Sequence, residues 1–152
     1  MLSQKAKYAL KAMIRLARSD DGRPVLIATL AKDERLPKKF LERILLDLKT
    51  GGLLESRKGK GGGYRLARAP KKISLGEIIR LMDGPLAPVS CVSKMAYRRC
   101  RDCASETECC VRPIMKKVRD SIAGVLDGTT LADALKKGGR KGRASSVRAL
   151  KA

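Results

Sequence analysis

Five cysteines are the residues of this chain best suited to chemistry, and most of them lie close together. Their pattern is Cys91-x8-Cys100-x2-Cys103-x5-Cys109-Cys110. Because the chain has no histidine, a soft metal site here must be built mainly from thiolates. Thiolates select zinc, Cu(I) or iron–sulfur clusters, so this segment predicts metal binding or redox chemistry.

The spacing of the cysteines leaves the kind of site open. Zinc usually takes paired C-x2-C knuckles, and only Cys100 and Cys103 have that spacing. A reactive loop without metal is the plain alternative. We expect nearby arginines to lower the pKa of the thiols and to offset the charge of a cluster; these are Arg98, Arg99, Arg101 and Arg112.

The charge of the chain points to a nucleic-acid partner. Lys and Arg number 35 against 15 Asp and Glu, which gives a net charge of +20. Basic side chains that neutralise phosphates release condensed counterions, and this release drives binding. A solubilising surface and acidic membrane lipid are the alternatives. The apolar runs fall far short of the roughly 20 residues that span a bilayer, so we expect no membrane partner.

The start of the chain bears on its compartment. Met1 leads through Ser3 directly into an expected helix, without an apolar secretion signal. We therefore expect a cytoplasmic protein, where thiols stay reduced. This expectation favours metal or redox chemistry at the cysteines over a disulfide framework.

Hydrophobic spacing predicts three helices in the first third of the chain. The first spans residues 3–18 with Ser3 as its N-cap, and a short one carries Ile27, Leu30 and Ala31. The third opens at Pro37, runs to Thr50 and stops at Gly51-Gly52. Two helices joined by a tight turn are typical of a helix-turn-helix.

The following segment predicts a β-hairpin wing with a basic, glycine-rich tip. Two short strands are expected within residues 53–66. Ser74 and Glu77 form a capping box, so another helix is expected up to Met82. The fold class is therefore mainly α with a small β-hairpin wing, a winged helix-turn-helix.

The remainder divides into three parts. Residues 86–110 lack periodicity and form the cysteine-rich loop, after a DNA-binding domain at 1–85. Residues 111–135 hold a long amphipathic helix, which we expect to pair with a second copy, and a short last helix to Leu135. Residues 136–152 are basic with nothing to bury, and we expect them to be disordered.

The expected DNA contacts lie at the start of the third helix and on the wing. The first group reaches base edges in the major groove and the second reaches phosphates or the minor groove. Glycines at the tip leave room for a close backbone approach. The residues are Pro37, Lys38, Lys39, Glu42 and Arg43, then Arg57, Lys58, Lys60, Gly61, Gly62, Gly63, Tyr64 and Arg65. A merely solvated hairpin and helix face is the alternative.

Enzymatic and nucleotide-binding functions find little support. Residues 59–63 do not match the phosphate-binding G-x-x-x-x-G-K-[ST] pattern, and no helix follows them. The chain lacks histidine, a Ser–base motif and paired carboxylates at helical spacing in a cleft-like context. We therefore expect no enzyme.

Taken together, these blocks resemble the Rrf2 family of bacterial transcriptional regulators over residues 1 to about 133. The resemblance rests on Phe40-Leu41-Glu42 and on residues 48–53, 56–67, 73–79 and 83–88, with further likeness at residues 7–10 and 109–114. It implies a winged helix-turn-helix whose long C-terminal helix crosses into a partner subunit. Members sense iron, iron–sulfur status, nitric oxide, redox state or cysteine supply.

The resemblance also implies a ligand set for an iron–sulfur cluster, either [2Fe-2S] or [4Fe-4S]. Cys91, Cys103 and Cys109 match the three cysteines of the cluster-bearing members. Relatives take a fourth ligand that varies, but the corresponding positions here hold Arg112 and Lys7. The fourth ligand is therefore open among Cys100, Cys110, Glu108 and water.

We expect a homodimer that binds a palindromic promoter site on double-stranded DNA, usually represses, and changes its affinity when the cluster is lost or oxidised. Two other hypotheses remain. One is a regulator of the same fold with zinc or bare redox-active thiols. The other is a nonspecific architectural DNA-binding protein.

Overall fold

The computed structural model describes residues 2–19 and 22–143, and over these residues the chain is mainly helical. Six α-helices, two 3-10 turns and one antiparallel hairpin follow each other along the described chain. Their bounds are α1 Gln4–Ala17, α2 Ile27–Glu34, α3 Lys38–Thr50, β1 Leu54–Arg57, β2 Gly63–Leu66, η1 Pro70–Lys72, α4 Leu75–Asp83, η2 Ser90–Val92, α5 Val111–Asp127 and α6 Leu131–Arg143. This confirms the mainly helical class with a hairpin wing.

Helix α1 lies at the centre of the folded body. Ser3 caps it as expected, because its Oγ accepts a hydrogen bond from the Ala6 N–H at 3.0 Å. The buried face of α1 contacts α2, α3, α4, α6 and β2. Three alanines on that face, Ala6, Ala9 and Ala12, are fully buried. Their small side chains let the neighbouring helices approach closely.

The helix-turn-helix consists of α2 and α3. The turn between them places Arg35 in the left-handed region with φ 53°, and the Leu36 N–H donates to the Ala31 carbonyl at 2.9 Å. Pro37 then caps α3, whose apolar stripe of Leu41, Ile44, Leu45 and Leu48 is fully buried. The stripe fixes the rotation of α3 and turns its polar face to solvent.

The wing is tied to the body by a third extended segment. Its register pairs Leu54 with Leu66 and Arg57 with Gly63. Val25 adds an isolated antiparallel bridge to Tyr64, with backbone hydrogen bonds of 2.8 and 2.9 Å. Strand β2 is therefore bonded, one residue from the hairpin turn, to the segment between α1 and α2.

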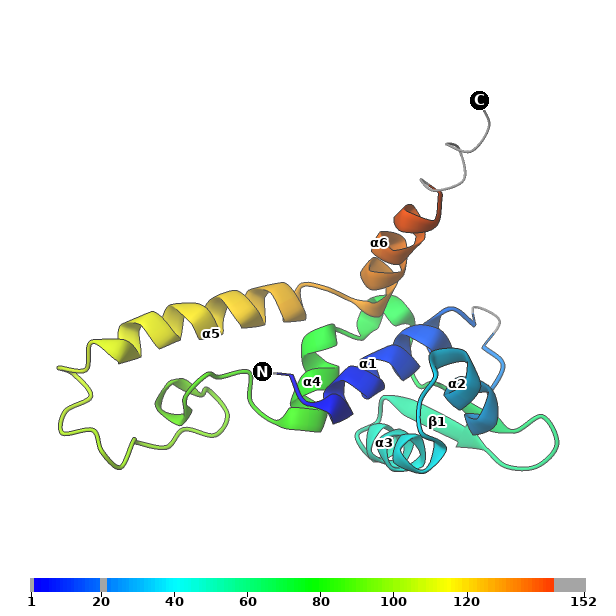
Figure 1. Ribbon diagram of the computed structural model, residues 1–152, viewed down its shortest axis with the longest axis horizontal. Coiled ribbons are helices and arrows are strands. Elements are labelled where there is room, and N and C mark those ends of the chain that lie inside the picture. The colour runs from blue at the N-terminus through cyan, green and yellow to red at the C-terminus, as the bar shows by residue number, and fades with distance from the viewer. Residues whose placement is uncertain (1, 20–21, 144–152) are drawn as a thin grey trace.

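Helix α5 runs along the outside of the molecule and contacts α4 and η2 (Figure 1). None of its residues is buried. Its apolar stripe is exposed, including Val111, Ile114, Val118, Ile122 and Val125. The cysteine-bearing loop and the wing lie at opposite ends of the long axis (Figure 1).

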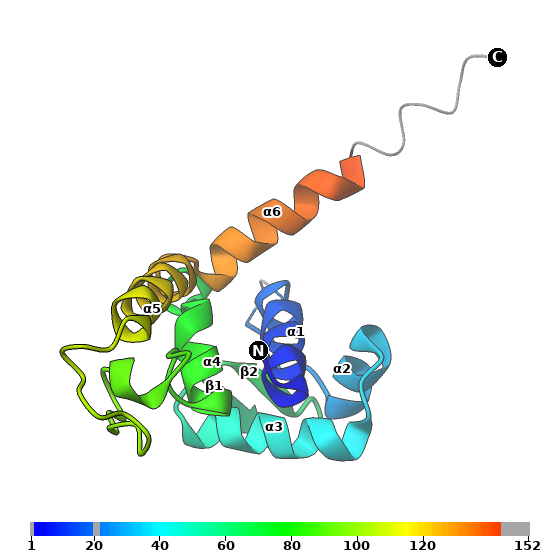
Figure 2. The same cartoon turned by 60° about the vertical axis from the view of Figure 1, so that its left-hand side comes forward.

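The last helix is longer than the sequence predicts. Instead of ending at Leu135, α6 continues to Arg143 and leads away from the body (Figure 2), so the expected disorder is wrong for residues 136–143. A reciprocal cap starts it, since Thr130 N–H donates to Asp133 Oδ2 at 3.1 Å and Asp133 N–H to Thr130 Oγ1 at 3.2 Å. Once a cap has started a helix, each added residue gains a backbone hydrogen bond at a small cost in entropy. Basic residues near the C-terminal end also interact favourably with the helix dipole. Residues 144–152 of the expected tail lie outside the described residues.

No helix in the described ranges combines the length and apolarity needed to cross a bilayer.

Two adjacent leucines of α3 test the packing. Leu45 is fully buried, whereas Leu46 is 49% exposed. We expect Leu45→Ala to lower the free energy of unfolding by about 2–5 kcal/mol, through lost burial and a residual cavity. Leu46→Ala should change it by about 0.5 kcal/mol or less. Urea denaturation followed by circular dichroism measures both; equal losses would contradict the described orientation of α3.

Candidate DNA-binding surface and cysteine cavity

The five residues predicted to read bases gather on the exposed side at the start of α3. All of them are solvent-exposed, namely Pro37, Lys38, Lys39, Glu42 and Arg43. Pro37 caps the helix rather than lying within it. The Arg43 side chain is 74% exposed, and its Nε lies 3.4 Å from Asp47 Oδ1. None of these residues belongs to the core.

The predicted wing residues divide into an exposed tip and a structural base. Arg57, Lys58, Lys60 and Gly61 are exposed at the tip. Arg65 is exposed as well, but its guanidinium donates to Glu55 across the strands at 2.8 and 3.0 Å. Tyr64 is half-buried against the core. The tip therefore offers the freer positive charge.

Two wing glycines are required by the chain itself. Gly63 has φ +137°, and a Cβ placed there would overlap the Val25 carbonyl. A Cβ at Gly62 would overlap the Arg57 carbonyl. The close backbone approach expected at these positions therefore occurs within the protein. Only Gly61 of the three has open space around its Cα.

A cavity of about 450 Å³ brings four of the five cysteines together. Cys91, Cys100, Cys103 and Cys109 all line it, with Asp102, Glu108 and Arg112 beside them. Cys91 is buried on η2, whereas Cys110 is exposed, does not line the cavity, and has its Sγ 3.8 Å from the Glu108 carbonyl. The predicted ligands Cys91, Cys103 and Cys109 therefore share one cavity with Cys100.

The thiols within this cavity form two pairs. Cys100 is in hydrogen-bonding contact with Cys91, and Cys103 is in the same contact with Cys109. Within the part of the chain that the structure describes, no three His, Cys, Asp or Glu side chains converge on a single metal ion. The arrangement is therefore pairwise around a common space, and it differs from a tetrahedral single-ion site.

The start of α5 sets the pKa of Cys109. The backbone N–H groups of Arg112 and Val111 donate to its sulfur and lower its pKa, and contact with Cys103 and the Arg112 charge act in the same direction. A helix N-terminus stabilises a thiolate through these unpaired donors.

The other two shifted thiols behave differently. The hydrogen bond with Cys91 raises the pKa of Cys100, and burial raises the pKa of Cys103 despite the opposing charge of Arg99. As expected, Arg112 lowers the pKa of Cys109 and Arg99 acts in the same direction on Cys103, but the pKa values of Cys100 and Cys103 are nevertheless raised. Desolvation and neighbouring thiols outweigh the arginine charge.

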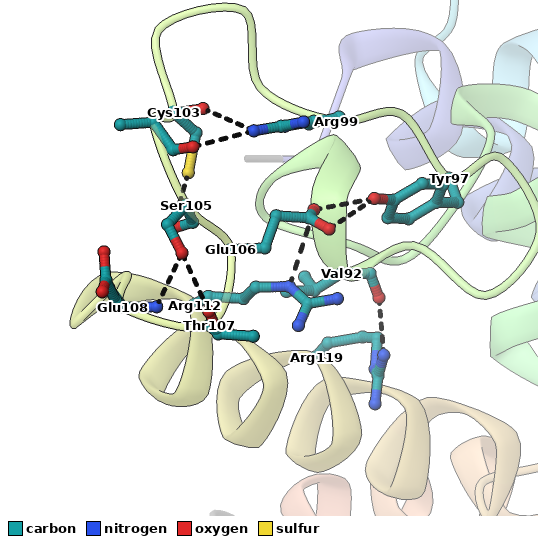
Figure 3. A network of polar contacts seen from close by, with 11 residues as sticks. Val92, Tyr97, Arg99, Cys103, Ser105, Glu106, Thr107, Glu108, Arg112 and Arg119 are labelled. Atoms are coloured by element: carbon teal, nitrogen blue, oxygen red, sulfur yellow. Dashed lines mark hydrogen bonds and ion pairs between the residues drawn. The ribbon is translucent and has the colours of Figure 1, made fainter.

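A polar network holds the loop next to α5 (Figure 3). Tyr97 donates to Glu106 at 2.7 Å, and Arg99 donates to the Cys103 carbonyl at 3.2 Å. Arg112 Nε lies 3.8 Å from Glu106 Oε1 and is buried without a hydrogen-bond partner. This buried cationic donor lies beside the thiols and is suited to an anionic group.

The sequence does not predict the role of one residue in this network. Arg119 of α5 donates to the Val92 carbonyl at 2.6 Å, directly beside Cys91, and also binds Asp120 at 2.7 Å. In the sequence it is one basic residue among many on a polar helix face. Its contact spans a long separation along the chain, and no local pattern predicts it.

With this geometry established, known proteins provide the comparison. The model of the Rrf2 family, described as iron-dependent transcriptional regulators, matches residues 2–137. The chain belongs to the Rrf2 family. It is therefore a transcriptional regulator with a DNA-binding fold rather than an enzyme, as its sequence predicts.

Individual relatives agree with this assignment. A putative rrf2-like regulator of Rhodobacter capsulatus is 43% identical over 141 residues, covering 91% of this chain and 94% of that protein. The solved structure of CymR, the global cysteine regulator of B. subtilis, has a TM-score of 0.76 at 32% identity, covering 90% of this chain and 97% of that one. IscR of T. potens has a TM-score of 0.71 at 32% identity, covering 91% and 88%.

Gly63 offers a test of the contact between β2 and the segment at Val25. We expect Gly63→Ala to destabilise this Rrf2-family protein by more than about 1 kcal/mol, because the added Cβ meets the Val25 carbonyl and the required φ is strained. Gly138→Ala is the matched control: its Cβ meets nothing on α6, so stability should rise by about 0.5–1 kcal/mol. Denaturant titration measures both. A tolerated Gly63→Ala would refute the described contact.

Proposed function

We propose that this regulator binds a palindromic operator as a homodimer, usually represses transcription, and has its DNA affinity controlled by an iron–sulfur cluster at the cysteine cavity. The observation that supports it best is the position of the cavity. Its cysteines lie against the N-terminal end of α5, the helix whose apolar stripe is exposed in the described chain.

The proposed DNA-binding surface combines α3 with the wing tip. Lys38, Lys39, Glu42 and Arg43 would face base edges in the major groove, since they are exposed and free of core packing. Arg57, Lys58 and Lys60 would bind phosphates of the flanking backbone. A net charge of +20 supplies the long-range attraction for this encounter.

The proposed dimer uses α5. Val111, Ile114 and Val125 are 56%, 58% and 67% exposed, which is unfavourable for apolar side chains in water. A second copy of the same stripe would cover them through a two-fold, isologous interface. Two α3 helices would then face two half-sites about one helical turn apart, roughly 34 Å.

The cavity residues fit an iron–sulfur cluster. Their donor set is thiolate-rich, and Arg112 also lines the cavity, where its positive charge would offset the negative charge of an anionic group. Cys91, Cys103 and Cys109 would hold the cluster. When bound, it would supply sensitivity to oxidants or to iron supply. A zinc site receives less support, because no three ligands converge on one ion in the described residues.

Bare thiols form a second candidate, favoured by one observation. Cys91 and Cys100 are already in contact, as are Cys103 and Cys109. Thiols this close form disulfides when an oxidant such as a peroxide removes two electrons from the pair. The fold and the DNA surface would be the same under this candidate.

A chain of contacts would couple the cavity to the DNA-binding domain. Arg119 joins α5 to the carbonyl next to Cys91. At the other end of α5, Asp127 accepts from Arg80 of α4 at 2.8 Å, and the Leu75 N–H donates to Thr129 at 2.9 Å. A change in the loop would therefore shift α5 against α4 and alter the spacing of the two α3 helices.

Salt dependence tests the DNA surface. We expect Arg57→Gln and Lys58→Gln each to reduce the slope of log affinity against log salt by about 1, because each removes one phosphate contact. Lys71→Gln on η1, outside the proposed surface, should leave the slope unchanged. Fluorescence anisotropy on an operator fragment measures this. A specificity ratio far below about 10³ would instead favour an architectural protein.

Arg119 tests the coupling. Cluster-loaded and apo protein should differ in operator affinity by roughly 5–150-fold, and Arg119→Gln should reduce this ratio without loss of bound iron. Lys117→Gln, an exposed neighbour on α5, should keep it. Equal affinities of loaded and apo wild type would reject control by a cluster, and an unchanged ratio in Arg119→Gln would reject the Arg119 contact as its route.

A further inference from the structure

The paired arrangement of the cavity thiols bears on the identity of the ligand that the family pattern leaves open. The two pairs come from different parts of the loop. Cys91 lies on η2 and Cys109 lies two residues before α5, while Cys100 and Cys103 lie at the two ends of one turn. That turn is closed by the Cys103 N–H, which donates to the Cys100 carbonyl at 3.4 Å. Of the two thiols on this turn, Cys100 contacts Cys91 and Cys103 contacts Cys109, and Cys103 Sγ also donates to the Ser105 carbonyl at 3.3 Å.

The pairing matches one kind of thiolate site and conflicts with two others. A single zinc ion requires its ligands to converge on one point, which no three ligands of the described residues do. A [4Fe-4S] cluster bound by four residues takes one ligand at each iron and therefore four separated thiolates. A [2Fe-2S] cluster takes two ligands at each of two irons, so its four thiolates are arranged as two close pairs.

Other donors near the cavity are less suited to the fourth position. Cys110 is exposed and does not line the cavity. Glu108 and Asp102 line the cavity but offer hard carboxylate oxygens, whereas iron–sulfur clusters take thiolates. Cys100 both lines the cavity and contacts Cys91.

We propose that Cys100 is the fourth ligand and that the cavity holds a [2Fe-2S] cluster through two thiolate pairs, Cys91 with Cys100 and Cys103 with Cys109. This inference rests on the proposed control by an iron–sulfur cluster. It assigns the group as wholly thiolate-bound, with Arg112 Nε as a cationic neighbour that offsets part of its charge.

The pairing is testable in the metal-free protein. Dibromobimane links two thiols that lie within a few ångströms, because each thiolate displaces one bromide, and the doubly reacted product is fluorescent. We expect peptide mass mapping of the reduced apo protein to find the Cys91–Cys100 and Cys103–Cys109 links. Links that join Cys110 to Cys91 or Cys109 in preference would overturn the pairing.

The ligand itself is tested by anaerobic reconstitution with ferrous iron and sulfide. Wild type and Cys110→Ser, the matched control, should each take up about two iron and about two sulfide ions per chain, with the same visible and electron paramagnetic resonance spectra. Cys100→Ser should lose the cluster or show shifted bands from oxygen ligation. Cys100→Ala should lose it, and both variants should keep the wild-type circular dichroism.

The outcomes separate the two levels of the proposal. A wild type that takes up no iron and sulfide overturns the cluster and this inference together. A loaded wild type whose spectra are unchanged in Cys100→Ser overturns Cys100 as ligand and leaves the cluster standing. About four iron ions per chain likewise overturn the paired [2Fe-2S] assignment alone.

Discussion

The burial of helix α1 is the constraint on which the rest of the structure depends. Its apolar face contacts α2, α3, α4, α6 and the wing strand β2. The three alanines on that face leave room for several elements around one short helix. At its start, Ser3 N–H donates to Asp83 at 2.9 Å and so joins the first helix to the end of α4. The DNA-facing and loop-facing halves are thus built on the same core helix.

A chain with a net charge of +20 must also keep its basic side chains outside that core, because they repel one another. It does so by placing basic residues on the outer faces of α3, the wing and α6, and by pairing several with acids. Lys5 and Arg43 both flank Asp47, and this pairing, through the Lys5 hydrogen bond first, lowers the pKa of Asp47. Lys38 and Lys39 at the start of α3 and the basic residues of the wing tip are exposed to solvent.

Local signals accounted for most of the fold, because they act within a turn or two of chain. Ser3 and Ser74 both cap helices through their hydroxyls, as the sequence predicts, and Gly51 ends α3. The sequence predicts that the last helix ends at Leu135 because the residues that follow are basic and have nothing to bury, whereas the Thr130–Asp133 cap and those basic residues sustain α6. Propensity alone does not weigh these opposing effects.

The candidate site was predictable in composition and unpredictable in arrangement. Cysteine types and spacing indicated a thiolate site, yet the contact of Cys91 with Cys100 depends on how the loop folds back. The same holds for Arg119 and the Val92 carbonyl, and for Val25 and Tyr64. Such pairs are decided by tertiary packing, to which sequence spacing contributes little.

The Val25–Tyr64 bridge has a consequence for how such a regulator evolves. The bridge joins the hairpin to the chain between α1 and α2. The wing and the helix-turn-helix are therefore connected by backbone hydrogen bonds as one DNA-binding unit. In a dimer, a signal would then change the spacing between the two DNA-binding units. The preference of each unit for its half-site would stay the same. Under the proposed function, base preference and responsiveness would be encoded in separate segments, α3 and α5, so substitutions in α3 could change the target genes while the cysteine cavity stayed the same.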